Sequence, residues 1–159
     1  MEGDEAFEGL WRAQFASVAR VAAGITGNID DGADLAQETF ARAYQHWNHV
    51  RSLDRPEAWL RQVAVRLAIS QVRRARRKGA AADRSGAVDP PVAPDEELVR
   101  TLHLLTPGQR SVVVLRFYLD LSVEEVARLL HKRPGTVRAL THQAMTRLRS
   151  ELRKESLDG

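Results

Sequence analysis

Hydrophobic residues recur every three or four positions through the first part of the chain. This spacing places them on one side of a helix over about residues 4–24, which is expected to end near Gly24 and Gly27. The members of the stripe are Trp11, Phe15, Val18, Ala22 and Ile25. No stretch of any length alternates hydrophobic and polar residues as a strand would, so the pattern predicts a helical unit.

Two further helices are predicted before residue 79. The second has Asp30 and Asp31 where they can cap its start and favour its dipole. Its expected buried stripe is Ala36, Phe40, Ala43, Tyr44 and Trp47. The third has Pro56 in its first turn and is hydrophobic around much of its circumference, as expected for a helix packed between neighbours. The N-terminal unit is therefore predicted to be a bundle of three or four helices.

The third helix keeps one polar stripe along its length. Its members, which fall within a narrow arc at about 100° per residue, are Gln62, Arg66, Ser70, Arg73 and Arg77. The run RRARRK at 73–78 concentrates positive charge at the end of the same helix, a pattern that favours contact with phosphates. A solvated helix end would give the same run, so charge alone leaves both interpretations open.

Residues 79–95, GAAADRSGAVDPPVAPD, separate this unit from the rest of the chain. They combine small residues with three prolines and no aromatic residue, a composition that predicts a flexible linker. The expected domains are therefore 1–78 and 96–159. The predicted fold class is all-α, with an N-terminal helical bundle and a C-terminal unit of four helices.

The C-terminal unit carries clear helix-start signals. Thr106, Pro107 and Gln109 form the pattern of a capping box with proline in the first turn. Ser122 and Glu125 repeat the capping pattern. Helices are expected over about 110–119, 122–130 and 134–152, with a short one over 96–105.

The helices at 122–130 and 134–152 are joined by only a few residues, which favours a helix-turn-helix. That motif needs a small residue where the helices cross, a residue that tolerates left-handed backbone in the turn, and a branched hydrophobic residue early in the second helix. Ala127, His131 and Val137 stand at these offsets. Any tight helical hairpin remains the alternative. Because His131 stands where glycine is usual, some backbone strain is expected.

Composition narrows the class of protein further. The absence of cysteine excludes disulfides and zinc–thiolate sites, and the net charge is +3. The acidic start does not resemble a signal peptide, and no hydrophobic run approaches the ~18 residues of a membrane span. We therefore expect a cytoplasmic protein without membrane insertion. His46 and His49 stand three residues apart, but no further metal ligand lies nearby in sequence, so no metal site is expected. We also expect neither a cofactor nor enzymatic activity.

Two sets of motifs in order resemble a bacterial RNA polymerase sigma factor of the extracytoplasmic-function (ECF) type, in the sigma-70 family. The first set is DLAQETFARAYQHW with EAWLRQVAVRLAISQVRRARR, followed by the proline-rich linker. The second is LTPGQRSVVVLRFYLDLSVEEVARLLHKRPGTVRALTHQAMTRLRSEL. The resemblance covers nearly the whole chain.

The resemblance implies that the second helix docks on the clamp helices of the β′ subunit of RNA polymerase. Asp34, Gln37 and Glu38 stand at i, i+3 and i+4, so a helix gathers them on one edge. Charge-assisted hydrogen bonds from these residues to a basic partner surface would fix the register of the interface. A solvated polar face is the alternative.

The resemblance also implies that the N-terminal unit recognises the promoter −10 element. The matching positions before the third helix are Asn48, His49, Val50, Arg51, Ser52 and Leu53. On that helix they are Gln62, Arg66, Ser70, Arg73 and Arg74, with Arg77 continuing the stripe. Capture of unpaired bases would open the duplex without ATP. Trp47 and Trp59 are expected in the core.

For the −35 element, the second helix of the helix-turn-helix would enter the major groove. The expected outward residues are Arg133, Thr136, Arg138, Ala139, His142 and Arg147, and the expected inward ones are Val137, Ala144, Leu148 and Leu152. The chain departs from the common family pattern at His131, Arg133, Leu140, Thr141 and Gln143. Leu140 is open to two interpretations, contact with a thymine methyl or repacking of the domain.

The resemblance further implies the β flap of RNA polymerase and an anti-sigma factor as partners, with a monomer when free. The main alternative is a stand-alone helix-turn-helix regulator whose N-terminal bundle serves dimerisation or ligand sensing. Such a regulator would bind its operator tightly by itself. A sigma factor would bind duplex DNA poorly until core polymerase joins it.

Overall fold

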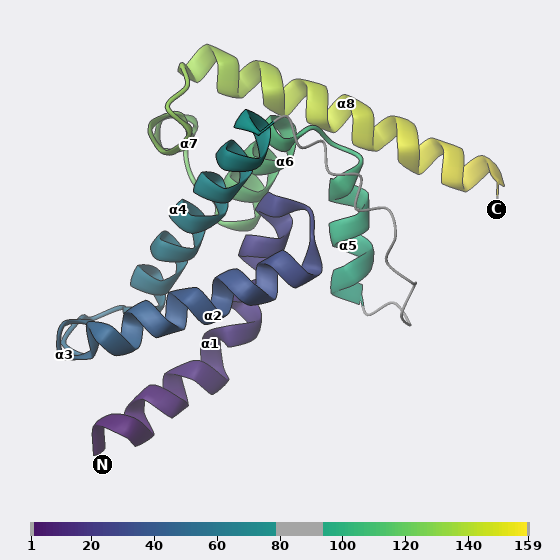
Figure 1. Cartoon of the computed structure of the whole chain (residues 1–159). Coiled ribbons are helices and arrows are strands. Elements are labelled where there is room, and N and C mark those ends of the chain that lie inside the picture. Colours follow the sequence, from purple (N-terminus) through teal and green to yellow (C-terminus); the bar gives the residue numbers. More distant parts are fainter. Residues whose placement is uncertain (1, 79–93, 159) are drawn as a thin grey trace.

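The computed structural model describes residues 2–78 and 94–158. The N-terminal unit comprises α1 (Glu2–Thr26), α2 (Ile29–Gln45), the short α3 (Trp47–Val50) and α4 (Pro56–Arg77). Helices α1, α2 and α4 pack against one another, as the bundle predicted from sequence requires (Figure 1). Most of the predicted linker lies outside the described residues, and its last two positions open the next helix.

A cluster of aromatic side chains packs α1 against α2 in this bundle. Phe40 of α2 is fully buried, and its ring lies 4.8 Å from that of Trp11 and 5.8 Å from that of Phe15 on α1. Trp47 and Trp59 are partly buried against the same cluster, which confirms that both tryptophans belong to the core. Aromatic pairs at these separations add stability beyond the area they bury.

The start and the buried stripe of α2 differ from the prediction. Asn28 is the N-cap, and its Oδ1 accepts a 2.9 Å hydrogen bond from the backbone N–H of Asp31. The predicted caps Asp30 and Asp31 instead lie in the first turn, where they still favour the helix dipole. Tyr44, predicted to be buried, is 58% exposed because the buried arc of α2 runs through Leu35 and Thr39 as well as Phe40.

The C-terminal unit comprises α5 (Pro94–His103), α6 (Pro107–Val113), the π-helical turn η1 (Val114–Tyr118), α7 (Val123–Leu130) and α8 (Pro134–Asp158). The capping box is complete: Gln109 N–H donates to Thr106 Oγ1, and Thr106 N–H donates to Gln109 Oε1. The helix predicted over 110–119 continues past α6 as η1. Leu119 N–H bonds to the carbonyl five residues earlier, at Val114, which defines the π geometry.

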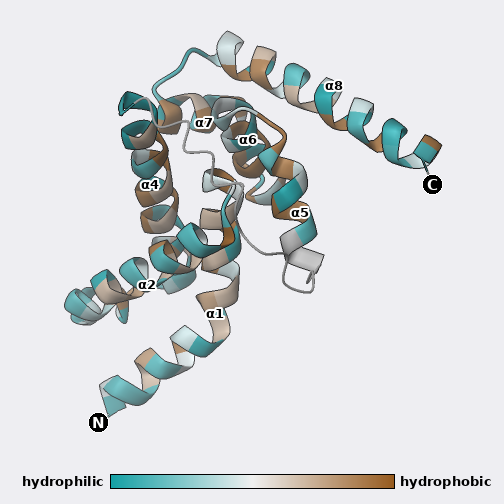
Figure 2. Ribbon diagram, turned by 45° about the vertical axis from the view of Figure 1, so that its right-hand side comes forward, coloured by the Kyte–Doolittle hydropathy of each residue, from teal (hydrophilic) through white to brown (hydrophobic). Residues whose placement is uncertain are grey.

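The two units share one hydrophobic core. Val21 and Ile25 of α1 and Ile69 of α4 belong to the same buried cluster as Leu115 and Val137 of the C-terminal unit. Figure 2 shows hydrophobic residues on the sides of α4 and α6 that face the interior. The separate domains expected from sequence are therefore packed together here, and no strand occurs in 2–78 or 94–158.

Helix α8 continues beyond the body of the molecule (Figure 1). Val137 and Ala144 are fully buried and Leu148 is partly buried, as predicted. The prediction is wrong for Leu152, which is 57% exposed because α8 has by then passed the helices that could cover it. Among the described residues, no helix combines the length and the hydrophobicity that crossing a membrane requires.

Candidate partner and nucleic-acid surfaces

The first candidate surface is the polar edge of α2. Asp34, Gln37 and Glu38 are all exposed, while Leu35, Ala36, Thr39 and Phe40 on the other side of the helix are buried. Thr39 can be buried because its hydroxyl donates a 2.7 Å bond to the Leu35 carbonyl. The fold therefore presents this edge outward, where a partner can reach it.

Within the edge, Glu38 makes one local ion pair. Its Oε1 lies 3.1 Å from Nε of Arg42, and both side chains are about half exposed. An exposed pair one helical turn apart contributes only about 0.3–0.5 kcal/mol. A cationic partner can therefore compete for the Glu38 carboxylate at little cost.

The second candidate surface begins at α3 and the turn after it. Asn48, His49, Arg51 and Ser52 are exposed, and the Ser52 hydroxyl donates a 2.6 Å bond to the His49 carbonyl. Val50 is fully buried. Its side chain is thus part of the core and cannot read a base, which corrects its inclusion among the matching positions. Leu53 is partly buried.

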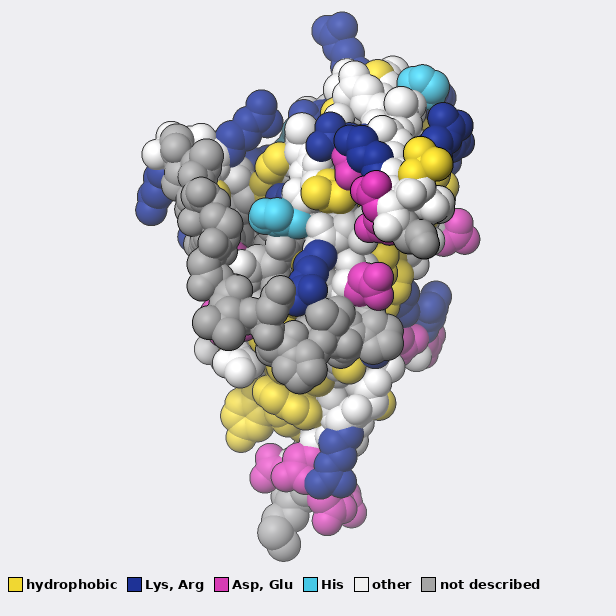
Figure 3. Space-filling view, turned by 90° about the vertical axis from the view of Figure 1, so that its right-hand side faces the viewer, with side chains coloured by type: hydrophobic (Ala, Val, Ile, Leu, Met, Phe, Trp, Pro, Cys, Tyr) yellow, Lys and Arg dark blue, Asp and Glu magenta, His cyan; other side chains and the backbone are white. Residues whose placement is uncertain are grey.

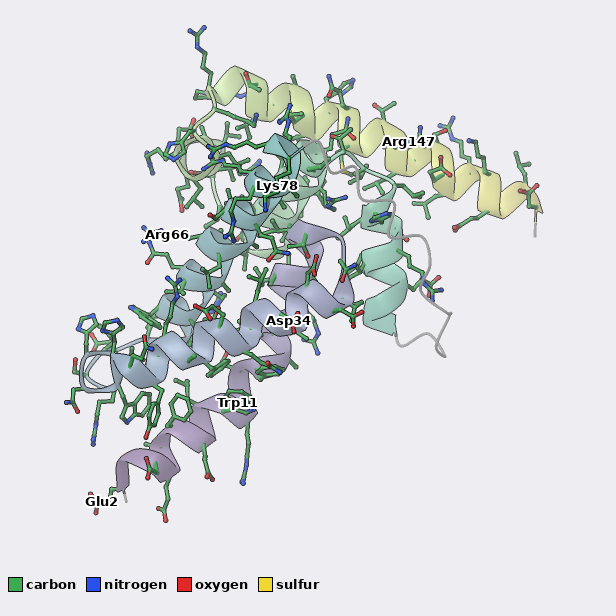
Figure 4. All side chains as sticks on the ribbon, viewed as in Figure 1. Glu2, Trp11, Asp34, Arg66, Lys78 and Arg147 are labelled. Atoms are coloured by element: carbon green, nitrogen blue, oxygen red, sulfur yellow. The ribbon has the colours of Figure 1, made fainter. Side chains whose placement is uncertain are left out.

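Helix α4 continues this surface along one wall of a hollow of about 830 Å³. Gln62, Arg66 and Ser70 are exposed in it, and Arg73 is half-buried. The opposite wall is formed by Leu119, Leu121, Glu125, Arg128, Leu129 and His131 of the C-terminal unit. Figure 4 shows Asp34, Arg66 and Arg147 on three different helices, well apart from one another.

The lining of the hollow is strongly basic. Arg55, Arg61, Arg66, Arg73 and Arg128 line it together with one carboxylate, that of Glu125. Arg55 at its edge pairs with Glu57 at 3.2 Å, and a backbone N–H and Arg55 together lower the pKa of the Glu57 carboxyl. Such a concentration of guanidinium groups suits a phosphate-bearing chain. Arg74 and Arg77 extend the charge as exposed side chains near the end of α4.

One of these arginines is already engaged by the other unit. Arg73 Nη2 donates a 2.9 Å hydrogen bond to the backbone carbonyl of Leu130, the last residue of α7. A cation is stabilised at this position because the carbonyls at a helix C-terminus are unpaired and carry partial negative charge. The predicted −10 residues and the helix-turn-helix are therefore in direct contact.

The helix-turn-helix has the geometry predicted from sequence. His131 takes the left-handed conformation, with φ 53° and ψ 45°, between α7 and α8. Ala127 and Val137 are buried where the two helices cross. Ser122 Oγ accepts a 3.1 Å bond from Glu125 N–H, which supplies the cap of α7.

The outer face of α8 is the third candidate surface. All six residues predicted to face outward are exposed: Arg133, Thr136, Arg138, Ala139, His142 and Arg147. Arg138 lies 3.8 Å from the Glu124 carboxylate, and Arg147 lies 3.4 Å from that of Glu151. The first pair is solvent-exposed and weak, and in the second the arginine is exposed although the Glu151 side chain is only 21% exposed. Both arginines can therefore reach phosphates or bases.

Three of the departures from the family pattern have structural roles. Leu140 is partly buried in the shared core and packs near Gly108, which favours repacking over contact with a base. The Thr141 hydroxyl donates a 2.7 Å bond to the Val137 carbonyl. Gln143 Oε1 accepts a 3.4 Å bond from Gln109 Nε2.

Sequence reasoning missed Arg110, which is only 7% exposed. Its Nε donates to the Ile25 carbonyl at 3.1 Å and its Nη1 to the Leu105 carbonyl at 3.2 Å. Burial lowers the pKa of this guanidinium. The signal was present: Arg110 stands four residues before Val114, on the buried side of α6, where a charge is unexpected.

Acidic side chains gather at the lower end of the face in Figure 3, where α1 begins, with hydrophobic side chains directly above them. The first turn of α1 carries Glu2, Asp4 and Glu5, which favours the dipole of that helix. The candidate DNA surfaces lie elsewhere, on α4 and α8. No cluster of three or more metal-ligating side chains occurs within the described parts of the chain.

Family models match both halves of the chain. The model described as sigma-70 region 2 matches residues 10–78, and the model described as sigma-70 region 4 matches residues 95–148. The region 2 match contains the candidate surfaces of α2 and α4. The region 4 match contains the helix-turn-helix and the candidate residues on α8.

Curated relatives match over most of the chain. The RNA polymerase sigma-E factor of Streptomyces antibioticus is 32% identical, over 96% of this chain and 87% of the relative. The ECF RNA polymerase sigma factor SigL of Mycobacterium tuberculosis (strain ATCC 25618 / H37Rv) is 31% identical, over 85% of this chain and 82% of the relative.

A solved structure shares the fold. It is the co-crystal structure of the sigma factor RpoE with the anti-sigma factor NepR from Bartonella quintana, with a TM-score of 0.63 and 21% sequence identity. The match covers 94% of this chain and 98% of that chain.

Proposed function

The chain belongs to the ECF group of the sigma-70 family, whose members bind core RNA polymerase and recognise promoter elements, and from this premise we propose which surface performs each task. The observation that carries the proposal is that the residues of the three predicted surfaces are exposed, apart from Val50, Leu53 and Arg73, and lie on helices whose opposite sides are buried. The working domains are residues 1–78 and 96–159. The role is one of binding in transcription initiation, without catalysis of its own.

The exposed edge of α2 binds the β′ clamp helices of core polymerase. Replacing Asp34, Gln37 and Glu38 together by alanine removes two carboxylates and an amide from this edge, and each charge-assisted bond lost contributes about 1.5–3 kcal/mol. We expect affinity for core polymerase to fall at least 30-fold, measured by fluorescence anisotropy of labelled chain. The double variant Asp4→Ala/Glu5→Ala, which removes the same charge from an exposed turn of α1, is the control. Wild-type affinity of the triple variant would refute the assignment.

The α3 turn and the polar stripe of α4 hold the unpaired −10 strand. Trapping one flipped base is worth about 1–3 kcal/mol, comparable with the cost of opening one base step. The Gln62→Ala/Arg66→Ala variant is therefore expected to lose at least tenfold in transcription from duplex promoters while keeping its affinity for polymerase. On a template whose −10 segment is already mismatched, activity should recover. Equal loss on both templates would argue against a role in strand opening.

The outer face of α8 reads the −35 element. Arg138→Ala should weaken promoter binding by about 1–3 kcal/mol if this arginine contacts a base edge. Arg153→Ala, also on α8 and exposed but outside the matched region, is the control. Equal promoter affinities of the two variants in the presence of core polymerase would exclude Arg138 from −35 recognition.

A stand-alone regulator is not favoured, because both halves of the chain match sigma-factor regions in the expected order. We also propose that the chain acts in the cytoplasm, is monomeric when free, contacts the β flap, and is held inactive by an anti-sigma factor. The similar structure, a sigma factor with its anti-sigma factor, supports the last point by analogy. Transcription by core polymerase and the purified chain alone, on promoters recovered from its own genome, is the test. Failure at every promoter would refute the assignment as a complete sigma factor.

A further inference from the structure

The recognition helix of the proposed −35 surface, α8, is tied to α6 by a short chain of hydrogen bonds. The backbone N–H of Thr106 donates to Oε1 of Gln109 at 3.2 Å, and Nε2 of Gln109 donates to Oε1 of Gln143 at 3.4 Å. Gln109 N–H also donates to Thr106 Oγ1, so both the side chain and the backbone of Gln109 are held by the capping box. The amide of Gln143 is therefore attached to the first turn of α6.

The order of donors and acceptors along these bonds is fixed from one end. A backbone N–H can only donate, so the end of the Gln109 amide that faces Thr106 must be the oxygen. The other end of that amide is then the NH2 group, which can only donate. Gln143 must therefore accept with its oxygen, and its own NH2 group faces away from Gln109.

Gln143 lies on the side of α8 that the proposed −35 surface uses. It follows Ala139 by one helical turn and precedes Arg147 by one turn, and all three residues are exposed. On the inner side of the same stretch, Leu140 Cδ1 lies 3.7 Å from the Cβ position of Gly108, so this part of α8 is packed on the start of α6. The amide pair thus lies where the packed side of α8 meets its outer face.

An outward NH2 group distinguishes between base edges in the major groove. Guanine presents two acceptors there, N7 and O6, whereas cytosine presents the N4 donor. A glutamine whose oxygen is free also reads adenine, because it accepts from N6 while it donates to N7. With its oxygen held by Gln109, the Gln143 side chain favours guanine.

We propose that Gln109 is a positioning residue for −35 recognition. It does not touch DNA, but it turns the NH2 group of Gln143 outward, and Gln143 thereby selects guanine at one position of the −35 element. This inference rests on the proposed function and deepens it, because it names a base preference of the same surface. Neither residue is among the outward residues predicted from sequence.

The Gln109→Glu variant tests this polarity without changing any residue that meets DNA. Glutamate serves in a capping box as well as glutamine does, so α6 keeps its cap. One oxygen of the introduced carboxylate accepts from Thr106 N–H, and the other can only accept from Gln143. The Gln143 amide must then turn over and present its oxygen outward. We expect the preferred base at this position to change from guanine to a base with a donor, cytosine or adenine, with relative affinities shifting about tenfold.

The base preference is measured by competitive binding of a library of −35 sequences to the full chain with core polymerase. Gln143→Ala should remove the preference at this one position and leave the other positions unchanged. Gln143→Glu should favour cytosine, because the N4 group of cytosine donates to a carboxylate. Gln45→Glu, the same chemical change at an exposed position of α2, is the control and should keep every wild-type preference.

A uniform loss of affinity in Gln143→Ala, with no change of preference at any single position, would show a purely structural role and refute the proposal. A Gln109→Glu protein that keeps both its thermal stability and the wild-type base preference would contradict it equally. If Gln109→Glu is unstable, the two Gln143 variants decide. Failure of the wild-type chain to show any −35 preference with core polymerase would instead refute the proposed function.

Discussion

The two units of the molecule are built differently around their cores. The N-terminal bundle has an aromatic cluster of its own, centred on Phe40, in addition to its part in the shared core. The buried hydrophobic residues of the C-terminal unit that form a cluster all belong to the shared core, together with Val21, Ile25 and Ile69. The bundle therefore has a core that does not depend on the C-terminal unit, whereas the core of the C-terminal unit is completed by residues of the bundle.

The two candidate DNA-binding surfaces, on α4 and α8, also differ in how much they interact with the rest of the chain. The outer residues of α8 are exposed, and their ion pairs are weak. The stripe of α4 faces the C-terminal unit across the hollow, and Arg73 is bonded to it. The candidate −10 surface is therefore more enclosed by the rest of the chain than the candidate −35 surface.

The largest expected effect is the loss of stability when the aromatic cluster of the N-terminal bundle is disrupted. Phe40→Ala removes a fully buried ring that contacts Trp11 and Phe15, and should lower the free energy of unfolding by about 3–5 kcal/mol. Thermal unfolding followed by circular dichroism measures it. Tyr44→Ala, at an exposed position of the same helix, should cost much less. Similar losses for the two variants would contradict the aromatic cluster as the core of the bundle.

The next largest expected effect tests whether the two units share one hydrophobic core in solution. Leu115→Ala in η1 should cost about 2–5 kcal/mol, because its side chain is fully buried among residues of both units. Hydrogen exchange should quicken in α6 and α7 and also at the end of α1 around Val21 and Ile25. Exchange around Phe40 should change little. A change confined to the C-terminal unit would show that the core is not shared in solution.

A smaller effect concerns the helix caps of the C-terminal unit. Thr106→Ala removes one half of a complete capping box, and Ser122→Ala removes the cap of α7. Each should cost about 1 kcal/mol in urea unfolding. The Gln109→Ala variant removes the other half of the capping box, the bond from Thr106 N–H to Gln109 Oε1. Glu124→Ala, at a residue that caps no helix, serves as the comparison. No loss for Ser122→Ala would mean that another group caps α7.

The smallest expected effect is a gain in stability, whereas the three changes above lower it. His131→Gly relieves left-handed backbone at φ 53° and should stabilise the chain by about 0.5–1 kcal/mol. Asp120, also left-handed at φ 56°, provides a comparison in which Asp→Gly should gain less because aspartate tolerates this conformation better. A destabilised His131→Gly protein would indicate that the imidazole makes a contact worth more than the strain.

Local signals in the sequence predicted much of this structure. The capping box at Thr106, the left-handed His131 and the outward face of α8 depend on neighbouring residues, and all three were predicted. The edge of α2 was also predicted to face outward, because Asp34, Gln37 and Glu38 share one side of a helix. Which partner each surface binds stays a prediction from the family resemblance.

Some local features were missed, and so were features that depend on distant parts of the chain. The cap Asn28 was overlooked because aspartates follow it, and the π-helical turn after Val113 has no distinct hydrophobic period. Leu152 was placed inside because spacing cannot show where the neighbouring helices end. The role of Arg110 depends on carbonyls 85 and 5 residues away along the chain, so spacing within α6 offered only an unexplained charge.

The buried guanidinium of Arg110 has a consequence for ionic strength. Its bonds run to neutral carbonyls inside the protein, where dissolved ions screen poorly. DNA binding by exposed arginines releases counterions and weakens steeply as salt rises. Higher salt should therefore weaken the proposed DNA contacts of the exposed arginines while it leaves the bonds of Arg110 almost unchanged.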